Sequence, residues 1–451
     1  MPRTISTICV ALLLVVGSGC ERSGTFAEPS LDAQLRQDVS RWGAMPIGPM
    51  PAQDPALVDL GRALMFDPIL SGNRDVACAT CHHPSTHAAD GLSLAIGTGG
   101  SGLGEGRTLG PGRQFVPRNA PSLLNDGLGL VYLFWDGRLS NFLVGPPPPP
   151  VAAGVAPGVP GILAAQAGLP VLDRREMRGE PGDRDVFGAP NELAQFADGD
   201  STAIRQAIMR RLVAIPDYVA KFTRAFPGTP ASQLRFEHAG AALAAFQMQA
   251  LTKSDSPFDR YLSHDDAALT TQQKRGGRLF FGKAQCSTCH NGPLLGGGSF
   301  ANAGVPQLGP GSPATPPLDR GRADLPNQSF YQFAFRVAPL RNVELTAPYM
   351  HDGAFATLEA VVRHYNDVPL ALKTYDPSQL APTLRGTYHG DAATTDSVLG
   401  SLDFRLRPSL GLTDDEIRDL VAFLQSLTDP SARDLSALVP ATVPSGLPVP
   451  R

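Results

Sequence analysis

Two short segments with the pattern Cys-x-x-Cys-His constrain this chain more than any other feature. The first is "CATCH" at 78–82, and the second is "CSTCH" at 286–290, about two hundred residues later. Each segment places two thiols three positions apart and an imidazole directly after the second thiol. The repetition predicts two similar structural units, one around each segment.

Cys-x-x-Cys-His is the attachment signature of c-type haem. Zinc ribbons pair two Cys-x-x-Cys units at a spacing of about 15–20 residues. A redox Cys-x-x-Cys is typical of a thioredoxin-like βαβ pattern, which this sequence lacks. We therefore predict two covalently bound haem c groups. The attaching residues are Cys78, Cys81, Cys286 and Cys289, and the iron ligands that follow them are His82 and His290.

The N-terminus has the pattern of an export signal. Arg3 precedes an apolar run at 8–16, and small residues at 17–19 precede Cys20. This pattern predicts a signal peptide over residues 1–20 with a lipobox, and a periplasmic protein anchored through lipid on Cys20. Ordinary signal cleavage and a retained anchor are the alternatives. Because the other four thiols bind haem, we expect no disulfide despite the oxidising compartment.

Composition limits the classes of partner. The chain has 451 residues, 18% of them charged, and a formal net charge of -4. This charge gives no basic field for nucleic acid. Gly 47 and Pro 43 predict long, turn-rich connections between helices. The segment at 145–161 is so proline-rich that it forms a separate insert, whose role the sequence leaves open.

Periodicity predicts a mainly α fold of two cytochrome-c-like haem domains with long Gly/Pro-rich loops. We expect the first domain at 54–250, the second at 251–428, and a loose, Pro-rich tail at 429–451. Asp54 and Pro55 mark a helix start, and Thr413 with Glu416 forms a capping box. Further helices are predicted at 201–226 and 236–251. The internal similarity pairs Gly61, Arg62, Leu64 and Phe66 with Gly277, Arg278, Leu279 and Phe281.

With these residues in hand, the chain resembles the bacterial di-haem cytochrome c peroxidase family, and its MauG-like branch in particular. The resemblance runs from about 60 to 427. It rests on "LSGNRDVACATCHHP", "RNAPSLLN", "FWDGR", a Gln-x9-Glu-Met segment, "CSTCH" and "RNVELTAPYMHDGAFATLEAVV". It implies that the N-terminal haem reacts with hydrogen peroxide and that the C-terminal haem relays electrons.

The resemblance also implies roles for three side chains. Glu176 matches the family's catalytic glutamate, Gln166 would orient peroxide, and Trp135 would carry electrons between the haems. Without the resemblance, Glu176 would be a solvated loop carboxylate among arginines, and Trp135 would be a core residue.

The family carries a calcium ion between the haems. The matching positions here are the side chain of Asn119 and the carbonyls of Thr346 and Pro348. Oxygen ligands suit a hard cation.

Two positions depart from the commoner family pattern. Many members close the first haem with a histidine sixteen residues after the proximal one, where this chain has Thr98. We therefore expect an open iron site that needs no reductive activation. Many members ligate the second haem with a methionine fourteen residues after the histidine of "PYMHDG", where this chain has Tyr365. His364 is the rival ligand.

The expected function is reduction of hydrogen peroxide with electrons from a small redox protein such as a cytochrome or cupredoxin. An alternative is MauG-like oxidation of aromatic residues on a partner protein. A non-catalytic electron carrier or haem sensor is the alternative from another class. The resemblance also makes a homodimer possible, and the sequence does not name the physiological donor or substrate.

Overall fold

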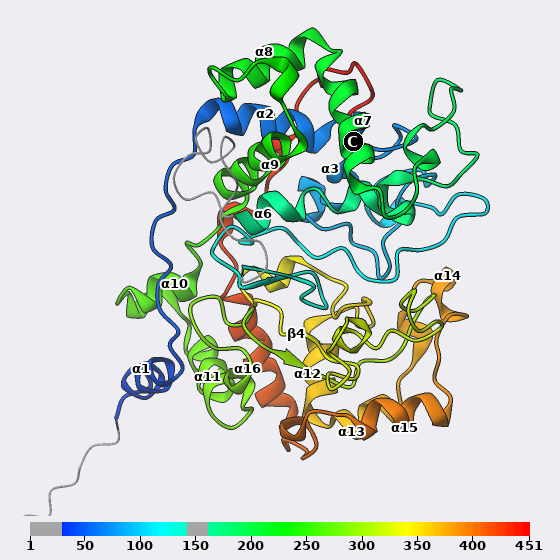
Figure 1. Ribbon diagram of the computed structural model, residues 1–451. Coiled ribbons are helices and arrows are strands. Elements are labelled where there is room, and N and C mark those ends of the chain that lie inside the picture. The colour runs from blue at the N-terminus through cyan, green and yellow to red at the C-terminus, as the bar shows by residue number, and fades with distance from the viewer. Residues whose placement is uncertain (1–28, 142–160) are drawn as a thin grey trace, which may run out of the picture.

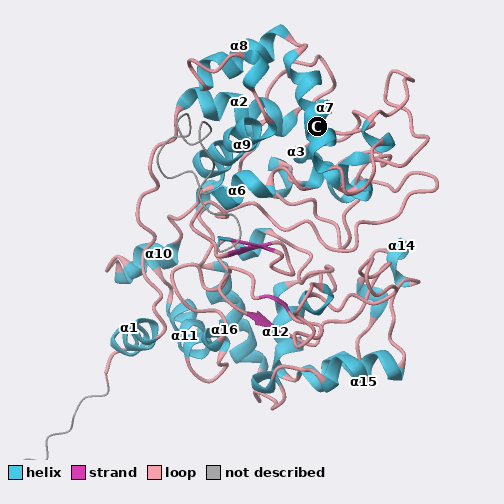
Figure 2. Cartoon of the chain, viewed as in Figure 1, coloured by secondary structure: helices cyan, strands magenta, loops and turns pink. Residues whose placement is uncertain are grey.

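The computed structural model describes residues 29–141 and 161–451. The predicted signal peptide with Cys20 lies outside these residues, as does nearly all of the proline-rich insert. The described chain is mainly α and forms an upper and a lower lobe (Figures 1 and 2). The helices of the upper lobe are α2 (Pro55–Phe66), α3 (Cys78–Cys81), α6 (Gly161–Gln166), α7 (Ser201–Val213), α8 (Pro216–Ala225) and α9 (Phe236–Leu251).

The lower lobe holds the other α-helices of the described residues and one of the two small sheets found there. Its helices are α1 (Leu31–Arg41), α10 (Pro257–Leu262), α11 (Thr271–Phe281), α12 (Leu358–Asn366), α13 (Val368–Lys373), α14 (Pro382–Arg385), α15 (Ala392–Gly400) and α16 (Asp414–Gln425). Its antiparallel strands are β3 (Phe300–Ala301) and β4 (Phe335–Arg336). The other antiparallel pair, β1 (Tyr132–Leu133) and β2 (Leu139–Ser140), lies near the boundary between the lobes (Figure 2).

Each lobe is built on a close helix crossing that a glycine permits. In the upper lobe, a Cβ on Gly61 of α2 would lie 2.0 Å from the carbonyl oxygen of Ala242 on α9. In the lower lobe, a Cβ on Gly276 of α11 would lie 1.9 Å from the carbonyl oxygen of Asp419 on α16. The structural match of Gly61 is therefore Gly276, one position before the predicted Gly277. This register pairs Leu64 and Phe66 with Leu279 and Phe281 without a gap.

The predicted helices begin at the residues that carry the capping signals. The Asp54 side chain accepts a hydrogen bond from the Ala56 N–H, and Pro55 opens α2. The Thr413 side chain accepts from the Glu416 N–H at the start of α16. The single helix predicted over 201–226 is wrong, because it is two helices. Ile215 is extended and Pro216 begins α8, as expected for a residue before proline.

The two ends of the chain cross over to the opposite lobe. Helix α1 packs on α11, where Lys274 pairs with Asp32 at 2.7 Å and Arg278 pairs with Asp38 at 2.6 Å. The C-terminal tail leaves α16 and runs back to the upper lobe (Figure 1). Each lobe therefore contains a segment from the far end of the sequence.

The expectation of a loose tail is wrong. Four of its side chains are buried in the upper core: Ala432, Leu435, Val443 and Leu447. The Ser445 hydroxyl donates to Asp67 at 2.6 Å. The ring nitrogens of His83 and His87 contact the carbonyl oxygens of Pro450 and Ala432 at 3.2 and 3.1 Å. These two histidines therefore pack against the tail.

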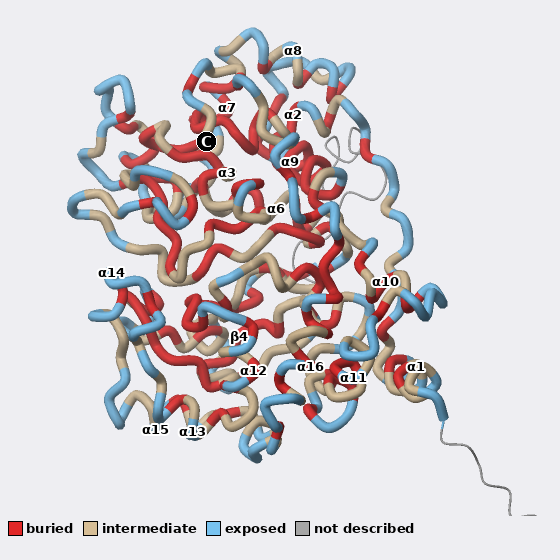
Figure 3. Tube along the Cα trace, turned by 180° about the vertical axis from the view of Figure 1, so that it is seen from behind, coloured by how far each residue is buried: buried red, intermediate tan, exposed pale blue. Residues whose placement is uncertain are grey.

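A buried arginine joins segments from the two halves of the chain. Arg118 donates to Asp136 at 2.6 Å and to both carboxylate oxygens of Asp319 at 2.6 and 2.9 Å. Burial alone would lower the pKa of this guanidinium, but the two carboxylates raise it well above its ordinary value. Buried residues run through both lobes and along the boundary between them (Figure 3). Across the described ranges, we find no helix with both the length and the apolarity needed to span a membrane.

The glycine crossing predicts the effect of one added methyl group. We expect Gly61→Ala to lower the free energy of unfolding by about 1–3 kcal/mol, because its Cβ overlaps a backbone carbonyl that cannot move aside. Gly48→Ala is the control, because nothing lies within 4 Å of a Cβ at that position. We expect the control to stay within about 0.5 kcal/mol of the unmodified protein. Denaturant unfolding measures both, and equal stability of the two variants would refute the close crossing.

Candidate functional site

The first Cys-x-x-Cys-His segment forms one short helical turn. Helix α3 carries Cys78 and Cys81, and His82 ends it. The Nδ1 atom of His82 lies 3.1 Å from the carbonyl oxygen of Ala88. Since a carbonyl oxygen only accepts, Nδ1 carries the proton and Nε2 keeps its lone pair free. Burial lowers the pKa of His82 to about 4, so the ring is neutral at pH 7.

The second segment reproduces this arrangement in the lower lobe. Cys286 begins a 3₁₀ turn, and the Nδ1 atom of His290 lies 3.1 Å from the carbonyl oxygen of Leu295. Burial lowers the pKa of His290 to about 4. Both imidazoles are therefore held in the tautomer that an iron ligand needs.

The donor set fits haem c better than zinc or a redox disulfide. All four cysteines are free thiols. Burial raises the pKa of Cys78 to about 11 and that of Cys286 to about 12, so both thiols are protonated at neutral pH. Within the described residues, no cluster of three or more His, Cys, Asp or Glu side chains could hold a metal ion. Paired neutral thiols beside a neutral imidazole match the requirements of a covalently attached porphyrin.

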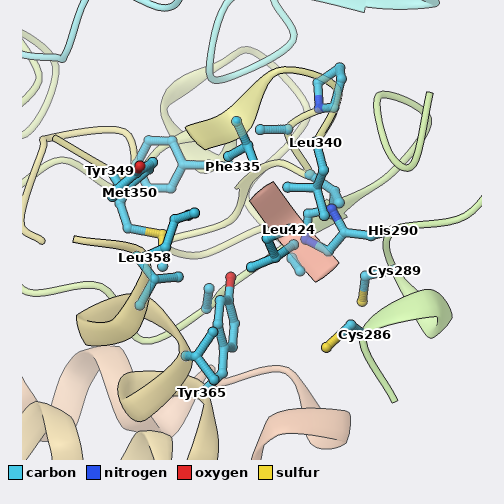
Figure 4. Close-up of a pocket in the computed structure, with 18 of the residues that line it drawn as sticks. Cys286, Cys289, His290, Phe335, Leu340, Tyr349, Met350, Leu358, Tyr365 and Leu424 are labelled. Atoms are coloured by element: carbon cyan, nitrogen blue, oxygen red, sulfur yellow. The ribbon is translucent and has the colours of Figure 1, made fainter. Parts of the chain in front are cut away.

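A largely apolar cavity of about 260 Å³ surrounds the second segment. Cys286, Cys289 and His290 line it from one side, and Tyr365 of α12 lines it from another. The Tyr365 hydroxyl points into the same space that the imidazole faces (Figure 4). Burial and the two nearby thiols raise the pKa of Tyr365 above its ordinary value.

His364 lies outside this cavity. Its Nε2 atom is 2.8 Å from the carbonyl oxygen of Ala303, and its ring packs on Phe355 at a centroid distance of 4.8 Å. Met350, which the sequence did not single out, does line the cavity (Figure 4). The structure therefore presents Tyr365 and Met350, and not His364, to the space beside His290.

A carboxyl group lies beside the first segment. Glu176 belongs to a five-residue π-helical turn at Arg174–Arg178, and its charge acts on both Cys78 and Cys81. Burial, together with the charge of Asp173, raises the pKa of Glu176 to about 8, against a smaller opposite effect of Arg138. Gln166 is the last residue of α6 and is half-buried.

Thr98 packs against the Glu176 turn. Its N–H donates to the Glu176 carbonyl oxygen at 2.9 Å, and its hydroxyl donates to Asp75 at 2.8 Å. Arg107, which the sequence did not reveal, is buried nearby and donates to the carbonyl oxygens of Ile96 and Gly97, both at 2.6 Å. In the sequence, Arg107 is one of two arginines in a Gly-rich loop, and this pattern does not indicate a specific role.

Trp135 and the predicted calcium positions share the cavity with the second segment. The indole N–H of Trp135 donates to the carbonyl oxygen of Asn119 at 2.9 Å, and the Asn119 amide donates to the Leu92 carbonyl oxygen at 2.7 Å. Asn119, Thr346 and Pro348 all line this cavity. Leu92 follows the first Cys-x-x-Cys-His segment, so these contacts connect the two candidate haem sites.

Comparison with known proteins assigns the family. Residues 55–267 match the family model described as di-haem cytochrome c peroxidase. The chain is 32% identical to the methylamine utilization protein MauG of Methylorubrum extorquens, over 85% of this chain and 82% of that protein. It is 30% identical to the cytochrome c551 peroxidase of Pseudomonas aeruginosa, again over 85% of this chain and 82% of that protein.

The chain belongs to the di-haem cytochrome c peroxidase family. Membership makes it an oxidoreductase, and the family implies two haem c groups. The predicted resemblance is confirmed. The fold also resembles a crystal structure of a MauG-like protein associated with microbial copper homeostasis. That match has a TM-score of 0.58 and 27% identity, covering 87% of this chain and 95% of the other. The diheme peroxidase BthA of Burkholderia thailandensis shares the fold, with a TM-score of 0.56 and 22% identity, over 86% of this chain and 93% of that one.

The two attachment segments predict the haem content of cysteine variants. We expect the double substitution of Cys78 and Cys81 by alanine to leave one covalent haem per chain, the one attached at Cys286 and Cys289. The same change at Cys286 and Cys289 should leave the haem attached at Cys78 and Cys81. Pyridine haemochrome absorbance per chain measures this content, and two haems are expected for the unmodified protein. A double variant that retains both covalent haems would contradict the assignment of its thiols.

Proposed function

We propose that this di-haem peroxidase reduces hydrogen peroxide at the His82 site with electrons that pass through the Cys286–Cys289 site. The overall change is H2O2 + 2 e⁻ + 2 H⁺ → 2 H2O, and a small redox protein, a cytochrome or cupredoxin, supplies the electrons. The observation that carries the proposal is the Glu176 carboxyl beside Cys78 and Cys81. An electron carrier or haem sensor would have no use for an acid–base group at this place.

Glu176 is the proposed proton carrier. When bound, the haem iron supplies the site at which the peroxide O–O bond is reduced. The Glu176 carboxylate would accept a proton from the peroxide oxygen on the iron side. It would return this proton to the other oxygen, which leaves as water. A pKa of about 8 suits both directions of transfer near neutral pH. Gln166 would hold peroxide by hydrogen bonding.

Thr98 supports an open site at the first haem. Its hydroxyl is already bonded to Asp75, and its backbone is bonded to the Glu176 turn. A threonine held in this way leaves the face beside Glu176 accessible to peroxide. No reductive activation step is then needed.

The residues that line the shared cavity support the roles proposed for the region between the haems. Trp135 relays electrons, since its indole is hydrogen-bonded to Asn119 in the wall of that cavity. A calcium ion would be bound by the side-chain oxygen of Asn119, whose amide nitrogen donates to the Leu92 carbonyl, and by the carbonyl oxygens of Thr346 and Pro348. Tyr365 would supply a ligand to the iron of the second haem.

MauG-like oxidation of aromatic residues on a partner protein is the second candidate function. The placement of Tyr365 in the cavity favours it, because the resemblance implies a tyrosine at this position in MauG-like enzymes and a methionine in many other members. In either case the protein would work in the periplasm, anchored through lipid on Cys20, with a homodimer as the proposed assembly. Peroxide-dependent oxidation of a reduced cytochrome or cupredoxin supports the first function. Covalent change of a protein substrate without such turnover supports the second.

Glu176→Gln tests the proposed proton carrier. We expect the rate constant for peroxide consumption to fall by on the order of 10²–10⁴-fold, the usual contribution of a positioned general base. In the unmodified protein, the rate should fall as the pH drops below about 8, because protonation removes the base, and the Gln variant should lose this dependence. Glu180→Gln is the control, being exposed in the same loop. Stopped-flow mixing with the protein as isolated measures both, and an unchanged rate in Glu176→Gln would overturn the role.

Tyr365→Phe tests the axial ligand. We expect it to abolish the low-spin electron paramagnetic resonance signal of the second haem, because phenylalanine offers no ligand atom. His364→Ala and Met350→Leu should leave that signal unchanged. If either control variant changes the signal and Tyr365→Phe does not, the ligand assignment is wrong.

A further inference from the structure

Arg336 is a buried cation that forms no ion pair with any residue that the structure describes. Only 6% of the residue is exposed, and its Nε and Nη1 atoms have no hydrogen-bond partner. Within residues 29–141 and 161–451, no carboxylate comes within ion-pair distance of it.

The other arginines that line the same cavity are neutralised. Arg341 pairs with buried Asp259, and Arg405 pairs with Asp403 at 2.7 Å. Asp126 is the carboxyl group whose charge acts on Arg336. Burial raises the pKa of Asp126 to about 6, whereas a carboxylate in a closed ion pair has a lowered pKa. Asp126 lines the same cavity, but no ion pair or hydrogen bond joins its carboxyl group to Arg336 in the described residues, so the Arg336 Nε and Nη1 atoms keep no partner.

The position of Arg336 is fixed by its backbone. Arg336 lies on β4, and its N–H donates to the carbonyl oxygen of Trp135 at 2.6 Å. The preceding residue, Phe335, stacks on His351 at a centroid distance of 3.5 Å. The strand thus holds an unpaired guanidinium in the wall of the cavity that Cys286, Cys289 and His290 also line.

A buried cation requires an anion, because removing a charge from water without a partner is strongly unfavourable. The group that the family places in this cavity is a porphyrin, whose edge carries two propionate carboxylates. A planar guanidinium with free N–H donors is the side chain best suited to bind a carboxylate. We propose that Arg336 binds a propionate of the haem attached at Cys286 and Cys289. This assignment rests on the two-haem function proposed above.

The assignment gives Arg336 a positioning role in electron transfer. One residue would join the edge of the second haem, through its side chain, to the backbone of Trp135, through its N–H. The positive charge would also favour the reduced, less positive state of that iron. Hydrogen bonding, charge and burial around a haem are the means by which a protein sets its potential.

Arg336→Gln tests the proposal by spectroelectrochemical titration of both haems across a range of pH. We expect the midpoint potential of the second haem to fall and to become dependent on pH near neutrality. The freed propionate would take up a proton on reduction, so the potential should decrease as the pH rises. Arg336→Lys should restore most of the potential, since it keeps the charge. Arg405→Gln, which removes a cavity arginine that already has a partner, should not create the pH dependence.

The outcomes separate this proposal from the proposed function. An Arg336→Gln protein with two haems and an unaltered, pH-independent potential overturns the assignment of Arg336. If that variant fails to retain both haems, Arg336→Lys decides, because restored haem content and potential support the ion pair and their loss overturns it. If the unmodified protein shows only one haem redox couple, the two-haem function fails instead.

Discussion

The buried ion pairs of Arg118 hold the candidate sites in their relative positions. Asp136 follows Trp135 in the chain, Asn119 follows Arg118, and Asp319 comes from a loop of the second half. The side chains of Arg118, Asp136 and Asp319 are only 14%, 6% and 5% exposed. Loss of one partner from such a group would leave a buried charge uncompensated, which is far more costly than loss of a surface pair. The positions of Trp135 and Asn119 in the cavity wall therefore depend on a contact that forms only when both halves of the chain have folded.

The exchange of chain ends makes each lobe depend on the other. Without α1, the lower core would lose Leu35 and Val39 and the ion pairs to Asp32 and Asp38. Without the tail, the upper core would lose its four buried tail side chains and the bond from Ser445 to Asp67. The lobes resemble each other in their glycine crossings, but neither is completed by a continuous stretch of sequence. A hinge opening between the lobes would strain both α1 and the C-terminal tail, because each packs on the opposite lobe. These two segments therefore help to fix the distance between the candidate haem sites.

Sequence patterns predicted what depends on neighbouring residues. The capping groups at Asp54 and Thr413, the helix at 236–251 and the two attachment segments all follow from local chemistry. Pro216 was also a local signal, and the interpretation of 201–226 as one helix gave it too little weight. The pairing of Gly61 with Gly276 was missed by one position, because the choice between adjacent glycines depends on which one meets the partner helix. The packing of the tail, the Arg118 ion pairs and the unpaired Arg336 depend on residues far apart in the chain, and no local pattern marks them.

In the proposed function, the same motif serves two different tasks. Both Cys-x-x-Cys-His segments hold their imidazoles in the same way, through Nδ1 and a carbonyl five or six residues downstream. The motif therefore cannot decide which haem meets peroxide. Glu176 reaches the first site from a turn almost a hundred residues later in the chain, whereas Tyr365 reaches the second from α12. A proton-carrying carboxyl suits a site where bonds to hydrogen break and form, and an apolar cavity with a phenol and an arginine suits a site where only electrons move. The proposed difference between the two sites therefore rests on the residues that the rest of the fold places beside each motif.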